Sequence, residues 1–136
     1  MINLNGEIVS NNNANLSVFN RGLAYGDAVF ETIRVNGNQI LFWEDHYFRL
    51  MASMRIMRMR IPMEFTLEYL EKQIQDTIAS HGLPNTKSIR VKLTVYRDSQ
   101  GLYTPDENKT SFFISIKKIA SPFYTCLLYT SDAADE

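Results

Sequence analysis

The alternation of apolar and polar residues predicts two β-hairpins in the first third of the chain. In Ala28–Val35 the odd-numbered residues form one face and the even-numbered residues the other, which is typical of a strand. An Asn-Gly dipeptide follows and favours a tight turn, so Gln39–Trp43 is predicted as the return strand. Another Asn-Gly dipeptide joins Ile2–Leu4 to Glu7–Val9 and predicts a shorter hairpin at the amino terminus.

Helical spacing of apolar residues predicts two helices in the middle of the chain. Glu44 and Asp45 suit the first turn of a helix of about four turns. Its apolar positions are Phe48, Met51, Ala52 and Met59, or alternatively Leu50, Met54 and Met57. Thr66 suits the N-cap of the second helix, which His81 and Gly82 close. The apolar stripe of that helix is Leu67, Leu70, Ile74 and Ile78.

Two more strands, Ser88–Tyr96 and Ser111–Ile119, complete the predicted elements. The order is then two strand pairs, a helix pair and a last strand pair. This order predicts an α+β domain in which an antiparallel sheet has helices packed on one face.

Composition indicates a single domain and excludes several classes of protein and of binding partner. The 136 residues are 45% hydrophobic, which suits one domain, and a net charge of −1 does not indicate a polyanion-binding surface. No apolar run approaches the ~20 residues of a membrane span, and no signal peptide is evident, so a cytoplasmic location is expected. The single cysteine, Cys126, excludes an internal disulfide, and no metal-ligand spacing occurs.

A basic run of three arginines, Arg55, Arg58 and Arg60, could indicate binding to nucleic acid or to a membrane surface. Apolar residues interleave with these arginines. We therefore favour a core-facing apolar stripe with a solvated opposite face, and expect neither nucleic acid nor a membrane as partner.

Three segments together resemble a known family. They are NRGLAYGDAVFETIRV (Asn20–Val35), EDHYFRL (Glu44–Leu50) and SIRVKLTVYR (Ser88–Arg97). In this order they look like the N-terminal domain of the class IV, fold-type IV pyridoxal-phosphate enzymes. That family includes branched-chain and D-amino-acid aminotransferases and aminodeoxychorismate lyases, and the likeness runs from about Ile2 to Tyr124.

The resemblance implies a role for four residues. Arg49 matches the arginine that holds the phosphate of pyridoxal 5′-phosphate, as bidentate guanidinium donors suit a dianion. His46 lies three residues earlier on the same helical face, where we expect a packing or supporting role. Tyr25 and Phe30 match positions that line the substrate cavity, and in the family Tyr25 often projects toward a partner subunit's site.

Further substrate contacts are less specific in the sequence. Arg34 shares a strand face with Phe30 and is either part of the cavity wall or a surface arginine. Arg90 is a better candidate than Lys92 for binding a substrate carboxylate, with an outward-facing charge as the alternative. Tyr103, in the GLYTP loop, is expected to border the pocket unless this loop is an ordinary exposed turn.

No catalytic lysine is assigned. In the family, the Schiff-base lysine and the acidic partner of the pyridine nitrogen lie in the C-terminal domain, and Lys117 and Lys118 do not match the lysine motif. CLLYTSDAADE (Cys126–Glu136) resembles the translation of a sequencing-library transposase adapter. We therefore expect residues 1–125 to be an N-terminal domain, residues 126–136 an artefactual tail, and this fragment to be inactive.

The resemblance implies that the parent protein is an aminotransferase, which moves an amino group between an amino acid and a 2-oxo acid. A branched-chain substrate is the commonest in the family, and an aminodeoxychorismate lyase is the alternative. An alternative of another class is a non-catalytic α+β binding module with Arg49 as a weak anion site. The family also implies a homodimer.

Overall fold

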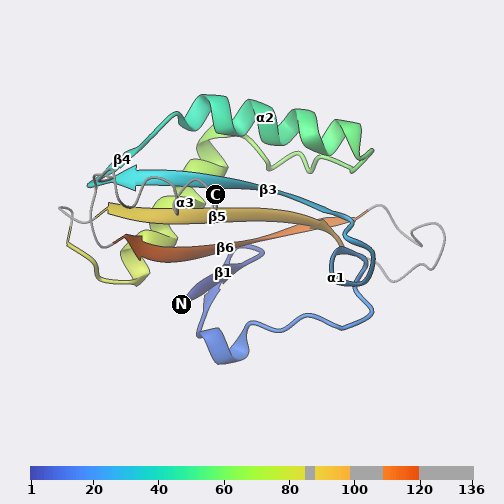
Figure 1. Ribbon diagram of the computed structural model, residues 1–136, viewed down its shortest axis with the longest axis horizontal. Coiled ribbons are helices and arrows are strands. Elements are labelled where there is room, and N and C mark those ends of the chain that lie inside the picture. Colours follow the sequence, from blue (N-terminus) through green and yellow to red (C-terminus); the bar gives the residue numbers. More distant parts are fainter. Residues whose placement is uncertain (85–87, 99–108, 120–136) are drawn as a thin grey trace, which may run out of the picture.

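The computed structural model describes residues 1–84, 88–98 and 109–119. Its centre is a six-stranded sheet with the strand order β2-β1-β6-β5-β3-β4, and all five neighbouring pairs are antiparallel (Figure 1). The strands are β1 (Ile2–Leu4), β2 (Glu7–Val9), β3 (Ala28–Asn36), β4 (Gln39–Ile40), β5 (Ser88–Arg97) and β6 (Thr110–Ile119). The helices are α1 (Arg21–Tyr25), α2 (Trp43–Ile56) and α3 (Leu67–Ser80), with a 3-10 turn at Asn11–Asn13.

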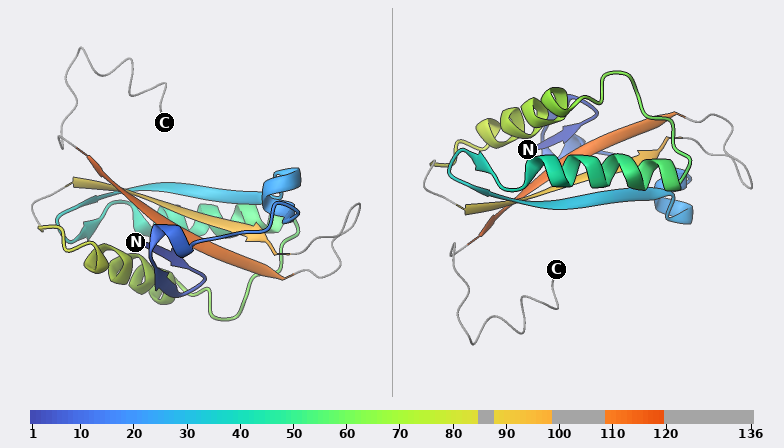
Figure 2. Two further views of the ribbon diagram at one scale, coloured as in Figure 1. Left: turned by 90° about the horizontal axis from the view of Figure 1, so that it is seen from below. Right: turned by 90° about the horizontal axis from the view of Figure 1, so that it is seen from above.

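The two long helices, α2 and α3, cover one face of the sheet (Figure 2). The core between them and the sheet includes Leu50, Met54, Leu70, Ile74, Ile33, Val91, Leu93 and Ile114, all fully buried. The predicted α+β class, with helices on one face of an antiparallel sheet, is confirmed. No helix in the described ranges is long and apolar enough to cross a membrane.

The short helix α1 was not predicted, and it lies at one end of the sheet (Figure 1). Asn20 caps it, because its side-chain Oδ1 accepts a hydrogen bond from the Gly22 amide at 2.8 Å. A Cβ on Gly22 would lie 2.8 Å from the Cβ of Tyr96, so α1 packs closely on β5. Tyr96 points to the face opposite α2 and α3, since its neighbour Val95 belongs to the core.

The predicted return strand Gln39–Trp43 is too long, because β4 ends at Ile40. Phe42 has a left-handed backbone (φ 55°), which turns the chain away from the sheet edge. Trp43 is then the first residue of α2, where its ring is buried and its Nε1 donates to the Leu67 carbonyl at 3.2 Å. Burial of the Trp43 ring, together with the hydrogen bond of its Nε1, therefore outweighs the strand preference of the local sequence.

The predicted second helix is confirmed, because Thr66 caps α3 by accepting the Tyr69 amide at Oγ1, at 3.1 Å. After Trp43, the buried positions of α2 are Leu50, Met51 and Met54, so the structure combines the two predicted stripes. Phe48 is exposed, contrary to the first of them.

The arginine run does not form the expected core-facing stripe. The helix ends at Ile56, which is exposed together with Met57, and Arg58 takes a left-handed backbone. Of the apolar residues in the run, Met59 is buried in the core. Ile56 lies two residues after the buried Met54 and therefore on the opposite face of α2, and Met57 follows the end of the helix.

Candidate functional site

The candidate site lies on the face of the sheet that α2 and α3 leave uncovered. The even-numbered residues of β3 point to this face, because Ile33 and Val35 belong to the core. Antiparallel pairing places Thr32 directly opposite Lys92 on β5 and Arg34 directly opposite Arg90. A shallow pocket of about 320 Å³ on this face is lined by Phe30, Thr32, Arg90, Lys92, Ser115, Ile116 and Lys117.

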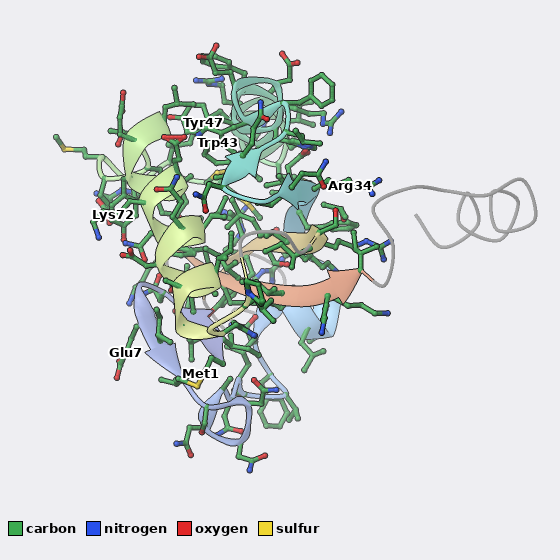
Figure 3. The ribbon with its side chains drawn as sticks, turned by 90° about the vertical axis from the view of Figure 1, so that its left-hand side faces the viewer. Met1, Glu7, Arg34, Trp43, Tyr47 and Lys72 are labelled. Carbon is green, nitrogen blue, oxygen red and sulfur yellow. The ribbon has the colours of Figure 1, made fainter. Side chains whose placement is uncertain are left out.

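The uncovered face is strongly cationic. Arg34, Arg90 and Lys117 stand side by side on three neighbouring strands, since Arg90 pairs with Arg34 on one side and with Lys117 on the other. The Lys92 ammonium lies 4.5 Å from the centre of the exposed Phe30 ring. Figure 3 shows Arg34 on the side of the sheet away from α3 and Lys72.

No acidic residue occupies a position of this face on the described parts of β3, β5 and β6. The positive charges therefore add, which favours an anionic ligand. An aromatic ring beside the cations gives the pocket one apolar wall, so a carboxylate joined to a hydrocarbon group suits it chemically.

Arg49 forms a second cluster, on the other side of β3. Its Nη2 donates to Oε1 of Glu31 at 2.7 Å, and its Nε donates to Oε2 at 3.0 Å. The Glu31 side chain is only 7% exposed, whereas that of Arg49 is 65% exposed. Nδ1 of His46 lies 2.6 Å from the same Oε1, so one buried carboxylate contacts two side chains of α2.

The electrostatics of the second cluster favour the ion pair. Burial raises the pKa of the Glu31 carboxyl, but hydrogen bonds from Arg49 and His46 outweigh burial and leave that pKa below its ordinary value. The hydrogen bond to Glu31 raises the pKa of the Arg49 guanidinium. Glu31 is therefore ionised at neutral pH.

The pocket and the Arg49 cluster are close in sequence but separated by the sheet. Phe30 and Glu31 are consecutive residues of β3, and their side chains leave opposite faces. β4 pairs only with Val35 and Asn36, so the outer edge of β3 beside Phe30 and Glu31 has no strand partner among the described residues. Both clusters thus border one open sheet edge.

The structure brings some predicted site residues together and leaves others apart. Phe30 and Arg90 line one pocket, and Arg34 lies beside Arg90 in the same cationic row. Tyr25 is outside this pocket, at the end of α1, half exposed and with the Arg21 guanidinium 5.0 Å from its ring centre. Tyr103 lies outside the described residues.

Sequence reasoning did not assign Glu31, Thr32 or Lys117 to a site. Thr32 could have been found from the alternation of β3, which already placed it on the face of Phe30. Lys117 could not, because its place beside Arg90 depends on the register between β5 and β6. Glu31 is a charged residue on a face of β3 that is otherwise apolar, and only its contact with Arg49 on α2 explains it.

Comparison with known proteins decides the family. Residues 28–125 match the family model of amino-transferase class IV. The chain belongs to this family. The matched range includes β3, α2 and β5, and so both clusters described above.

Relatives of this class IV aminotransferase chain include proteins named as branched-chain-amino-acid aminotransferases and proteins named as D-alanine aminotransferases. It is 32% identical over 96 residues to a protein of Methanocaldococcus jannaschii provisionally named a branched-chain-amino-acid aminotransferase, covering 71% of this chain and 32% of that protein. It is 28% identical over 91 residues to the D-alanine aminotransferase of Listeria innocua, covering 67% of this chain and 30% of that protein. The chain thus spans about a third of the length of these relatives.

Solved structures of branched-chain aminotransferases share the fold of this class IV chain. The enzyme of Thermoproteus uzoniensis with norvaline matches with a TM-score of 0.74 and 25% identity, covering 85% of this chain and 39% of that one. The T.th. enzyme with pyridoxamine 5′-phosphate matches with a TM-score of 0.74 and 26% identity, covering 88% of this chain and 40% of that one.

A phosphate-bearing cofactor fits the donors that this class IV chain presents. Glu31 uses the Nε side of the Arg49 guanidinium, and Nη1 has no hydrogen-bond partner among the described residues. The edge formed by Nη1 and Nη2 can therefore donate to two oxygens of one phosphate. A dianion there would lie beside a permanent positive charge on an exposed side chain.

Proposed function

We propose that this chain forms one part of a pyridoxal 5′-phosphate-dependent aminotransferase, which transfers an amino group between an amino acid and a 2-oxo acid. The observation that carries the proposal is the cationic pocket on the uncovered face, in a chain of the class IV family. When bound, the cofactor supplies an electron sink for reactions at the α-carbon of the substrate. The residues of this chain bind the cofactor and the substrate and orient them relative to each other.

Arg49 holds the phosphate of the cofactor through the Nη1 and Nη2 edge of its guanidinium. On the other side of β3, Arg90 and Lys92 bind the substrate carboxylate, and Arg34 adds to the positive potential. The Phe30 ring contacts the hydrocarbon side chain of the substrate. This apolar wall supports a branched-chain amino acid as substrate.

The active enzyme is proposed to be a homodimer. The segment around α1 exposes several large apolar side chains, namely Leu16, Val18, Phe19, Leu23 and Tyr25. A contiguous run of this kind suits burial against a second copy, and Tyr25 would then reach the partner's site.

The test uses the complete gene product that contains residues 1–125. With pyridoxal 5′-phosphate we expect a cofactor absorption band in the visible range and amino transfer from leucine to a 2-oxo acid. Arg90→Gln should raise KM for the amino donor about tenfold or more and change kcat less, because it removes a carboxylate-binding group. Arg55→Gln, an exposed arginine of α2 outside the pocket, is the matched control and should leave both constants unchanged.

Other outcomes assign another function. Transfer from D-alanine but not from leucine would overturn the branched-chain substrate. Release of pyruvate from aminodeoxychorismate without amino transfer would identify a lyase. Failure of the gene product to bind pyridoxal 5′-phosphate would overturn the enzyme proposal in favour of a binding module.

A further inference from the structure

Glu31 is a charged residue in an apolar row of the core. Pairing across the sheet places it opposite Leu93 on β5, and Leu93 opposite Ile114 on β6, and both of these side chains are fully buried. An apolar side chain at such a position is often as stabilising as a buried ion pair, or more so. Stability alone therefore does not explain the carboxylate at this position.

The geometry of the contact indicates what the carboxylate does. Arg49 approaches Glu31 side-on, with Nε 3.1 Å and Nη2 2.7 Å from Oε1, and Nε 3.0 Å from Oε2. This contact uses one edge of the planar guanidinium and leaves the Nη1 and Nη2 edge on the far side of the group. The Arg49 side chain is largely exposed, so Glu31 is what holds that edge in one orientation.

His46 supports the same arrangement. Its Nδ1 lies 2.6 Å from Oε1 of Glu31 and 3.3 Å from Nη2 of Arg49. An Nδ1–H of His46 that donates to Oε1 fixes the Glu31 carboxylate from the side of α2. The His46 ring is itself largely buried. His46 and Arg49 are three residues apart on α2, so one helix face supplies both contacts.

We propose that Glu31 is a positioning residue, which orients the Arg49 guanidinium for bidentate binding of a phosphate group. This inference rests on the proposed role of Arg49 as the phosphate ligand. A long arginine side chain loses conformational freedom when it binds an anion, and an arginine already held by Glu31 loses less. Orientation by Glu31 thus raises the affinity for phosphate although its own charge opposes an anion.

These two effects of Glu31 have opposite signs, which makes the test sharp. Glu31→Gln removes a negative charge near the anion, so electrostatics alone predicts equal or tighter binding of phosphate. Positioning predicts the reverse: affinity should fall roughly tenfold, the equivalent of holding one flexible side chain in place.

The experiment titrates the full 136-residue chain with pyridoxamine 5′-phosphate, which has a phosphate group but no aldehyde to react with lysines. Binding is followed by phosphorus NMR of the ligand phosphate, which serves every variant, and the mobility of the guanidinium is followed through the side-chain Nε–H signal of Arg49. We expect Glu31→Gln to weaken binding roughly tenfold and to speed solvent exchange of that signal. Glu68→Gln, an exposed acid of α3, is the matched control and should behave as the wild type.

Each outcome decides the inference. Weaker binding by Glu31→Gln supports it, and Glu31→Asp, which keeps the charge but shortens the reach, should also bind more weakly. If Arg49→Gln abolishes binding while Glu31→Gln and Glu31→Asp bind like the wild type or more tightly, positioning is wrong and the role of Arg49 stands. If Arg49→Gln binds like the wild type, or the wild type shows no saturable binding, both the inference and the proposed phosphate site are wrong.

A fold control accompanies these variants. Near-UV circular dichroism reports the packing of Trp43, which is buried one helical turn before His46 on α2. Should Glu31→Gln lose this signal, the titration of Glu31→Asp alone decides between positioning and electrostatics, because its charge is unchanged.

Discussion

Glu31 shows how one buried charge can be tolerated in this core. Its carboxylate is 7% exposed, and a hydrogen-bonded guanidinium and an imidazole compensate for the water it has lost. Because these contacts outweigh burial, the pKa of the Glu31 carboxyl lies below its ordinary value. The folded state therefore holds this group ionised more strongly than the unfolded chain does.

A pH dependence of stability follows from this pKa. Glu31 stabilises the fold at pH values above its unfolded pKa, and this contribution is lost as the pH falls through its lowered folded pKa. The wild type should lose more free energy of unfolding between pH 6 and pH 3 than Glu31→Gln, which has no carboxyl to protonate. At pH 6 the variant should be less stable by about 2 kcal/mol.

Urea unfolding at the two pH values measures this difference. Glu7→Gln removes an exposed acid of β2, outside any helix, and should follow the wild type at both. Equal losses in the wild type and in Glu31→Gln would show that another acidic group controls acid stability.

At the scale of elements, the position of α1 on β5 depends on the absence of a side chain at Gly22. This helix has only five residues, too few to be stable by itself, so its position comes from contacts with β5 and with its cap. Gly22 allows those contacts, because its Cα lies against Tyr96 and its amide donates to Asn20. Tyr96 is buried there, and burial raises its pKa to about 12, with Asp98 adding to the effect.

Gly22→Ala should therefore destabilise the protein. The new Cβ would lie 2.8 Å from the Tyr96 Cβ and 3.0 Å from the Asn20 oxygen, so α1 has to move away from β5. We expect a loss of about 1 to 3 kcal/mol, measured as a lower midpoint of thermal unfolding. Gly26→Asn is the control and should cost less, because the space around Gly26 is open and the only strain comes from a left-handed backbone that asparagine tolerates better than most residues. Unchanged stability of Gly22→Ala would mean that α1 is not docked on Tyr96.

At the scale of the whole molecule, one buried ion network joins three elements. Asp27 Oδ2 accepts hydrogen bonds from Arg21 Nε at 3.0 Å and Arg97 Nε at 2.7 Å. Nη2 of Arg97 also donates to the Met57 carbonyl at 2.7 Å, just after the end of α2. The network thus connects α1, the end of β5 and the end of α2 at one end of the sheet.

Breaking this network should cost far more than breaking an exposed ion pair. Arg97→Met removes a partner of a buried carboxylate, and we expect a loss of about 3 to 5 kcal/mol in the free energy of unfolding. Lys72→Met is the matched control. It breaks the 2.6 Å pair between Lys72 and Asp76 on α3. Because these two side chains are 70% and 46% exposed, the loss should be less than about 1 kcal/mol.

Urea unfolding of the two variants against the wild type measures both changes. Similar losses for Arg97→Met and Lys72→Met would show that the buried network contributes no more than a surface pair.

Local signals in the sequence determined much of this fold. Both Asn-Gly turns, the alternation of β3, the Thr66 cap and the glycine that ends α3 depend on neighbours within a few residues, so each could be predicted without knowledge of the rest. The same alternation placed Phe30 and Arg34 together on one face. The family motif added Arg49 and Arg90, which spacing alone does not distinguish from surface arginines.

Tertiary structure decided which residues these side chains contact. The row of Arg34, Arg90 and Lys117 exists only because β3, β5 and β6 pair in one register, which no local pattern specifies. The bond between Glu31 and Arg49 joins a strand to a helix 18 residues later, and the early end of β4 depends on burial of Trp43. The sequence by itself determined which face of β3 each of its residues takes, because the alternation of a strand is local. The partners across each face depend on long-range pairing and packing, which only the folded chain sets.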